Sequence, residues 1–221
     1  MLGDVAVIGL GQFGTQLAVS LAELGVPVLA IDSRMERVEQ LRSAVARVLC
    51  LNSTDEEALS AARLGDVGVA ICAIGDDVQA SILTVALVHQ LGVPRIVARA
   101  TSDLHARILR MVGATEVVNP ARDIAVRLAS RLLQPGLRDR VPIAPGYALN
   151  EIEAPGWTAG RTLIQLDVRK QFGLSILAVK RSDGGAEKVI ANPGGDTAIA
   201  QGDVLVTLGD DDSIRRFLAG S

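Results

Sequence analysis

The sequence predicts an α/β protein with a doubly wound parallel sheet in its first half and a smaller α+β domain in its second half. Short, almost continuously apolar runs alternate with amphipathic helical patterns over residues 1–120, as in a parallel sheet that helices cover on both faces. A Gly-x-Gly-x-x-Gly turn, Gly9 to Gly14, follows the first apolar run. Pro and Gly cluster after residue 133, which predicts a linker between the two halves.

Six β-rich runs are expected to form the sheet. They are Val5–Ile8, Val28–Asp32, Val48–Leu51, Val69–Ile74, Arg95–Arg99 and Glu116–Val118. Helices are expected between them, for example where Leu17, Leu21 and Leu24 share one helical face. Six strands of this kind fit the order 3-2-1-4-5-6, in which a ligand crevice lies at the carboxyl ends of strands one and four. The first half is therefore expected to be Rossmann-like.

Local signals add three expectations to this half of the chain. Thr54, three residues before Glu57, is expected to cap a helix in a capping box. Pro120 is expected to begin a helix that runs to about Leu133. Cys50 and Cys72 each lie inside an apolar run, so both are expected to be buried and free of disulfides.

The second half predicts a small α+β domain. Its expected strands and helices are Ala148–Glu153, Arg161–Lys170, Leu174–Lys180, Glu187–Ala191, Val204–Leu208 and Asp211–Leu218, with a hairpin turn at 182–185. The expected domains are a nucleotide-binding domain over 1–120, a bridging helix and linker over 121–140, and the α+β domain over 141–221.

The composition argues against a nucleic-acid-binding protein, and the pattern of the sequence argues against a secreted or membrane-spanning one. The net charge is −3 and only 2% of the residues are aromatic, so neither a basic surface nor stacking platforms for nucleic acid are expected. The N-terminus lacks the pattern of a signal peptide, and apolar stretches such as Val67 to Ile74 are too short to span a bilayer. A soluble, cytosolic protein is expected, with any membrane association made through a partner.

The glycine turn and Asp32 together predict a nucleotide site. Gly9 makes the tight turn, Gly11 lets the backbone approach a phosphate, and Gly14 lets the helix pack on the strand. The phosphates would meet the free N–H groups of a helix N-terminus. Asp32 lies 18 residues after Gly14, where it can accept from ribose hydroxyls, and its charge argues against a 2′-phosphate. The alternatives are a tight turn without a ligand and an Asp32 that only caps its strand.

A set of further segments runs along nearly the whole chain. The set comprises Val7–Gly14, Leu29–Asp32, Asn52–Thr54, Ala73–Gly75, Gln79–Ser81, Leu83–Thr84, Val112–Ala114, Leu166–Arg169, Ile176–Val179, Pro193 and Ile199 to Leu205. In these segments the chain resembles the regulatory subunits of Trk/Ktr potassium uptake systems (KtrA/TrkA-like), which are built from RCK (regulator of potassium conductance) domains. The resemblance implies a Rossmann-like RCK N-terminal lobe and a small α+β C-terminal RCK domain.

The resemblance also implies a regulator rather than an enzyme. In this family the N-terminal lobe binds ATP, ADP or NAD(H), and homodimers commonly assemble into an octameric ring. The ring docks on the cytoplasmic face of a potassium-translocating membrane subunit (KtrB/TrkH-like), and nucleotide exchange gates transport. The protein is therefore expected to be cytoplasmic and peripherally associated with the membrane. The C-terminal domain binds cyclic di-AMP in some members; Arg169 and Lys170 are candidates for that contact, with solvated helix-end charges as the alternative.

The resemblance extends the predicted nucleotide site beyond the glycine turn. In the family, positions after the third and fourth strands surround the adenosine, a basic residue at Arg99 reaches the phosphates, and a His at His105 lies near the nucleotide in some members. The complete predicted set is Gly9, Gly11, Gln12, Phe13, Gly14, Asp32, Ser33, Arg34, Asn52, Ser53, Ile74, Gly75, Asp76, Arg99 and His105. Alternatives remain: a helix cap for Asn52, an ion pair for Arg99 and an ordinary surface position for His105.

Two positions depart from the family pattern. Relatives that prefer ATP often carry Arg where this chain has Gln12, and a neutral amide cannot make a charge-assisted contact with a terminal phosphate. Discrimination between ATP and ADP is therefore expected to be weaker, or NAD(H) to be favoured. Some relatives carry a Glu that helps to bind a divalent cation where this chain has Ala121, so no metal ligand is predicted.

An NAD-dependent oxidoreductase is the alternative that the fold allows. Such an enzyme needs a proton donor or acceptor near the nicotinamide. The candidates are His89, which is expected on a helix surface, His105, and Tyr147, which lies beyond the linker. A redox or nucleotide sensor that acts on another partner is a further alternative.

Overall fold

The computed structural model describes residues 3–183 and 186–220 and divides into two compact units, Met1–Ala121 and Arg122–Ser221. The first unit contains a six-stranded sheet in which every pair of neighbours is parallel. The strands are β1 (Val5–Ile8), β2 (Val28–Asp32), β3 (Arg47–Cys50), β4 (Val69–Cys72), β5 (Ile96–Arg99) and β6 (Glu116–Val118). Their order is β3-β2-β1-β4-β5-β6, which confirms the predicted doubly wound topology.

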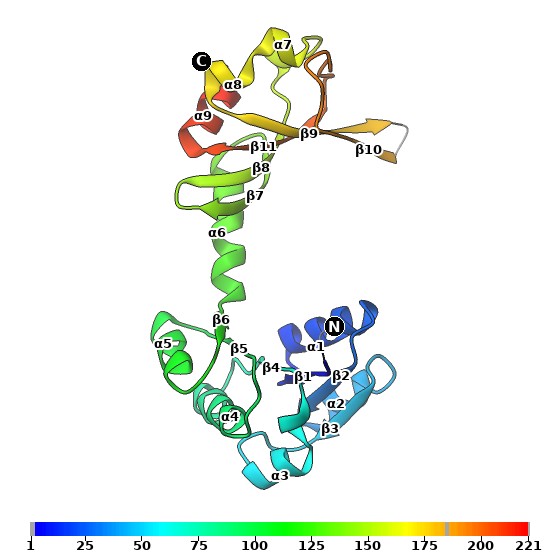
Figure 1. Ribbon diagram of the computed structural model, residues 1–221, viewed down its shortest axis with the longest axis vertical. Helices are drawn as coiled ribbons and strands as arrows, with labels where there is room; N and C mark the ends of the chain where they lie inside the picture. The colour runs from blue at the N-terminus through cyan, green and yellow to red at the C-terminus, as the bar shows by residue number, and fades with distance from the viewer. Residues whose placement is uncertain (1–2, 184–185, 221) are drawn as a thin grey trace. The chain divides into compact units, whose positions relative to one another are not determined.

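Helices cover both faces of this sheet (Figure 1). They are α1 (Gln12–Glu23), α2 (Met35–Leu41), α3 (Glu56–Ala61), α4 (Val78–Gln90) and α5 (Asp103–Met111), with a short 3₁₀ helix at Leu64–Asp66. Alternate residues of β1 enter two separate cores: Val5 and Val7 pack with α1 and α2, whereas Ala6 and Ile8 pack with α4 and α5. Because β1 and β4 are buried along both faces, their sequences are continuously apolar.

The predicted capping box of α3 is wrong by one residue. Asp55 is the N-cap, and its Oδ1 accepts from the N–H of Ala58 at 3.1 Å. The N–H of Thr54 instead donates to Oδ1 of Asn52 in a turn before the helix. Asp is at least as good an N-cap as Thr, so residue preference alone could not decide whether the helix begins after Thr54 or after Asp55.

The two cysteines differ, contrary to the expectation that both are buried. Cys72 in β4 is fully buried, and burial raises the pKa of its thiol to about 12. Cys50 is exposed because β3 is the edge strand of the sheet and Cys50 is its last residue. Its Sγ lies 3.5 Å from the carbonyl oxygen of Ser33.

One thiol per chain is therefore expected to react with a water-soluble disulfide reagent in the native protein. The thiolate is the reacting species, and Cys72 is inaccessible as well as protonated at pH 8. Spectrophotometric titration should count one fast thiol before denaturant is added and two after it. Cys50→Ser should abolish the fast reaction, and a fast thiol that remains in that variant would contradict the assignment.

The second unit contains a five-stranded sheet of order β10-β9-β11-β8-β7, in which all neighbours are antiparallel. Its strands are β7 (Leu137–Ala144), β8 (Tyr147–Glu153), β9 (Ser175–Asp183), β10 (Ala186–Ala191) and β11 (Val204–Asp210). The helices over this part of the chain are α6 (Pro120–Leu133), α7 (Leu163–Leu166), α8 (Val168–Phe172) and α9 (Asp211–Ala219), with a 3₁₀ helix at Gly156–Thr158. Residues 184 and 185 of the predicted hairpin turn lie outside the described residues.

Two predictions about this half need correction. The segment after α6 is not a linker over its whole length, because Leu137–Ala144 pairs with β8 as an edge strand. Pro142 lies within this strand, and an edge strand tolerates proline. The helix predicted over Arg161–Lys170 is two short helices, since Asp167 between them adopts a left-handed conformation with φ 39°. The start of α6 at Pro120 is confirmed.

Candidate nucleotide-binding site

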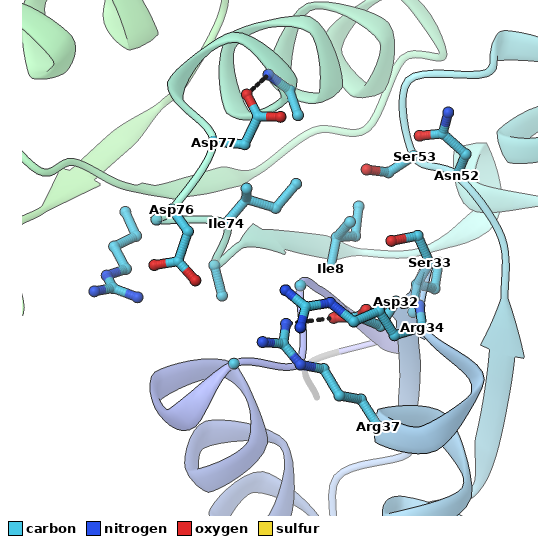
Figure 2. A pocket seen from close by; sticks show the side chains of 17 residues that line it. Ile8, Asp32, Ser33, Arg34, Arg37, Asn52, Ser53, Ile74, Asp76 and Asp77 are labelled. Carbon is cyan, nitrogen blue, oxygen red and sulfur yellow. Dashed lines mark hydrogen bonds and ion pairs between the residues drawn. The ribbon is translucent and has the colours of Figure 1, made fainter.

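A hollow of about 270 Å³ lies at the carboxyl ends of β1, β2, β4 and β5. This is the crevice that the strand order predicts, since β1 and β4 lie at the topological switch point. Of the predicted set, the residues that line it are Gly9, Gly11, Asp32, Ser33, Arg34, Asn52, Ser53, Ile74, Gly75, Asp76 and Arg99. In Figure 2, Asp32, Ser33, Arg34 and Arg37 come from one side of the hollow, and Ile74, Asp76 and Asp77 from another.

The three glycines of the turn differ in their surroundings. Gly9 has a φ of 93°, a conformation that favours glycine. A Cβ on Gly14 would lie 1.9 Å from the carbonyl oxygen of Gly9, so Gly14 permits the close packing of α1 on β1. A Cβ on Gly11 would meet no atom within 4 Å. Gly11 lines the hollow and is the N-cap of α1, with no side-chain cap on the helix, which leaves its first N–H groups for a ligand.

Asp32 joins the glycine turn to the start of α2. Its Oδ2 accepts from the N–H of Leu10 at 2.6 Å and from Nη1 of Arg37 at 3.3 Å, and its Oδ1 accepts from the N–H of Arg34 at 2.9 Å. The residue is only 7% exposed. Asp32 is therefore more than a strand-end cap, because it fixes the turn on which a ligand would rest.

Arg37 also lines the hollow and was missed from the sequence. It lies in α2, five residues after Asp32. One signal in the sequence could have identified it. A basic residue in the first turns of a helix that follows an acidic strand end can fold back and pair with that acid. Asp77 was missed too; it lines the hollow and caps α4 by accepting from the N–H of Ala80 at 2.9 Å.

The polar residues after β3 are held by local contacts. Oδ1 of Asn52 accepts from the N–H of Thr54 at 3.1 Å and from its Oγ1 at 2.9 Å. Asn52 therefore does not cap α3, whose N-cap is Asp55. The hydroxyl of Ser53 lies 2.8 Å from the hydroxyl of Thr84 in α4, and both residues are buried. This contact ties the loop after β3 to α4 and so fixes one wall of the hollow.

Arg99 is held at the hollow by two neighbours. Its guanidinium lies 5.7 Å from the centre of the Phe13 ring, a cation–π contact. A Cβ on Gly75 would lie 2.7 Å from its Cζ, so Gly75 leaves the space that the guanidinium fills. Phe13 does not line the hollow itself, and its contact instead positions Arg99.

Gln12 and His105 do not line this hollow. Gln12 lines a neighbouring hollow that shares Gly11, Arg34 and Arg37 with the first. His105 is 2% exposed, so the alternative of an ordinary surface position is wrong. Burial lowers its pKa, and its Nδ1 lies 3.3 Å from Oγ1 of Thr101. A direct contact between a nucleotide and either side chain stays a prediction.

Membrane-spanning helices and metal-binding clusters are both absent from the described residues. No helix within residues 3–183 and 186–220 combines the length and the apolar character needed to cross a membrane. Across the same residues, no three His, Cys, Asp or Glu side chains gather where they could hold a metal ion.

The fold and the hollow define a class of protein. The glycine turn opens a helix at the switch point of a doubly wound sheet, and an acid ends the neighbouring strand, as in Rossmann-like domains that bind nucleotides. Within this class, residues 5–120 match the TrkA-N domain and residues 151–219 match the TrkA-C domain. The chain belongs to the Trk/Ktr family of potassium uptake proteins, which confirms the resemblance seen in the sequence.

The relatives cover nearly the whole chain. It is 36% identical over 217 residues to Ktr system potassium uptake protein C of Bacillus subtilis, and the match covers 98% of this chain and 96% of the relative. It is 32% identical over 213 residues to Ktr system potassium uptake protein A of Vibrio alginolyticus, spanning 96% of this chain and 95% of the relative. The similarity to each relative therefore extends across both TrkA domains of this chain.

Solved structures give the same fold. The GsuK channel matches with a TM-score of 0.71 at 19% identity, over 100% of this chain and 40% of that chain. The Kef C-terminal domain of Shewanella denitrificans, solved in its AMP-bound form, matches with a TM-score of 0.50 at 27% identity, over 59% of this chain and 81% of that one.

Proposed function

We propose that the protein is a nucleotide-binding regulatory subunit of a potassium uptake system, which gates ion flow through a separate membrane subunit. One observation carries the proposal. The hollow at the switch point brings together the glycine turn, Asp32 and Arg99, in a chain that is similar over its whole length to Ktr potassium uptake proteins. Ligand binding would shift the population of ring conformations only as far as its affinity differs between them.

The proposed ligand is an adenine nucleotide: ATP or ADP, or NAD(H). Asp32 would accept from the ribose, the uncapped start of α1 would receive phosphate oxygens, and Arg99 would reach a terminal phosphate. The Kef domain solved with AMP, at 27% identity, supports an adenosine in this fold. Because Gln12 is neutral, we expect modest discrimination between ATP and ADP.

A regulatory role fits this site better than an oxidoreductase. His105 is buried and does not line the hollow, His89 is exposed on α4, and Tyr147 lies in the second unit. Neither histidine is therefore placed as a proton donor at the hollow. These positions support a binding protein without catalytic residues.

The proposed partners are a second copy of this chain and a potassium-translocating membrane subunit (KtrB/TrkH-like). Helix α6 has no buried residue and exposes apolar side chains. These are Ile124, Val126, Leu128, Leu132 and Leu133, which are 43–81% exposed. Exposed apolar faces of this kind mark interaction sites, which supports homodimers that assemble into an octameric ring. The ring would lie at the cytoplasmic face of the membrane.

Cyclic di-AMP is the proposed second ligand. A separate hollow of about 250 Å³ in the second unit is lined by Arg169 together with Asp167 and the apolar Leu163, Leu174 and Ile176. A guanidinium beside apolar side chains suits a phosphate and a base. Lys170 does not line this hollow, so Arg169 is the better candidate of the two.

A thermal-shift panel with ATP, ADP, NAD, NADH and cyclic di-AMP tests the proposal. A ligand at about 100 times its dissociation constant adds about 2.7 kcal/mol, which raises the melting temperature by roughly 5–10 °C for a chain of this size. We expect ATP and ADP to give such shifts. If no adenine nucleotide shifts the protein, the proposed ligand is wrong; a shift with NAD accompanied by turnover of NAD would favour an oxidoreductase instead.

A further inference from the structure

The hydrogen bonds of Asp32 leave little room for a ligand. A carboxylate accepts at about four lone-pair positions. Three donors already occupy Asp32: the N–H of Leu10, the N–H of Arg34 and Nη1 of Arg37. A ribose that binds through both its 2′ and 3′ hydroxyls needs two acceptor positions. One of the three donors must therefore leave when such a ribose binds.

Arg37 is the donor that can leave. The other two donors are backbone N–H groups, fixed by the glycine turn and by the start of α2. Their distances to Asp32 are 2.6 and 2.9 Å, whereas the contact from Arg37 is 3.3 Å long and its side chain is 27% exposed. A long contact from a flexible, partly solvated side chain is the weakest of the three.

Arg37 also has a place to go. It lines both the hollow described above and the neighbouring one of about 570 Å³, which lies beside α1 and α2. Glu36 and Gln40 line the second hollow and carry acceptor oxygens for a guanidinium. Arg37 can therefore release Asp32 while keeping polar partners.

We infer that Arg37 competes with the ribose hydroxyls for Asp32 and thereby sets how strongly the site distinguishes ribose from 2′-deoxyribose. This inference rests on the proposed nucleotide site. With Arg37 present, the hydrogen bond from the 2′ hydroxyl to Asp32 replaces the contact from Arg37, so the 2′ hydroxyl adds little to the binding affinity. Without Arg37, the 2′ hydroxyl forms that hydrogen bond without displacing another, so it adds the full value of the bond to the binding affinity. The presence of this competitor makes Arg37 a specificity-determining residue for the sugar.

The test compares ADP with 2′-deoxyADP, which carry the same charge. Isothermal titration calorimetry would give both dissociation constants for the wild type, Arg37→Met and Arg42→Met. We expect the ratio of the 2′-deoxyADP constant to the ADP constant to rise about 3- to 10-fold in Arg37→Met, as for one hydrogen bond gained. Because both ligands feel the lost positive charge equally, the ratio isolates the contact with the sugar.

Arg42→Met is the matched control. Arg42 follows α2, pairs with Glu39 on the surface and does not line the hollow, so its ratio should equal that of the wild type. An unchanged or smaller ratio in Arg37→Met overturns the inference while leaving the nucleotide site intact. Failure of the wild type to bind ADP overturns the proposed nucleotide site itself, and the competition with it. Arg37→Ala provides a second variant in which the same rise is expected.

Discussion

Replacing Gly14 with alanine is expected to lower the free energy of unfolding of the first unit by about 3 kcal/mol or more, the scale of a severe overpacking. The new Cβ would lie 1.9 Å from the carbonyl oxygen of Gly9 and 3.1 Å from Cβ of Ala73. The first atom belongs to the backbone and the second to a short, buried side chain, so displacing either one costs free energy. Thermal unfolding should show a melting temperature lower by roughly 6–12 °C.

Gly11→Ala is the matched control for this prediction. Its Cβ would enter open space, and its φ of −70° suits any residue. We expect a cost of at most about 1 kcal/mol, from an alanine at an N-cap. The same variant should weaken nucleotide binding, because the Cβ occupies the hollow that a phosphate would enter. Equal losses of stability in the two variants would contradict the distinct surroundings of the two glycines.

Asp32→Asn is expected to weaken ADP binding about 10- to 100-fold, the loss of roughly 1.5–3 kcal/mol from hydrogen bonds to a charged acceptor. Asparagine keeps the shape of the side chain and one acceptor oxygen for the N–H of Leu10 or Arg34. The fold is therefore expected to survive the change. Calorimetric titration with ADP measures the effect, and thermal unfolding without ligand checks the fold.

Asp66→Asn controls for the change in net charge. Asp66 lies in the same unit, is exposed, pairs with Arg63 and does not line the hollow. Its ADP affinity should match that of the wild type. Unchanged ADP affinity in Asp32→Asn, or an equal loss in both variants, would refute the assignment of the ribose contact to Asp32.

The parts of the first unit that follow from chain periodicity could be predicted. Continuous apolar runs are required wherever a parallel strand is buried on both faces, so the six strands and their order were found. The glycine turn and Asp32 were found because their chemistry depends on local spacing. Eleven of the fifteen predicted site residues line the hollow, mostly because strand ends converge at one edge of the sheet.

The residues that sequence reasoning missed depend on geometry across the chain. Arg37 reaches Asp32 because α2 turns back over the end of β2, so its place five residues after Asp32 points to the contact only once the direction of the helix is known. Cys50 was taken as buried although the predicted order already made its strand an edge. The linker predicted up to residue 140 overlaps the strand Leu137–Ala144 because the Pro and Gly cluster after residue 133 indicates a loop, whereas the pairing with β8 is visible only in the folded sheet.

The order β3-β2-β1-β4 has a consequence for how this chain can fold during its synthesis. The first strand made, β1, pairs on one side with β2 but on the other with β4, which ends at Cys72. At about 5–20 residues per second, a ribosome needs several seconds to add the residues between them. Over that interval the edge of β1 that pairs with β4 has no partner strand, so the crevice at the switch point cannot form before β4 is made.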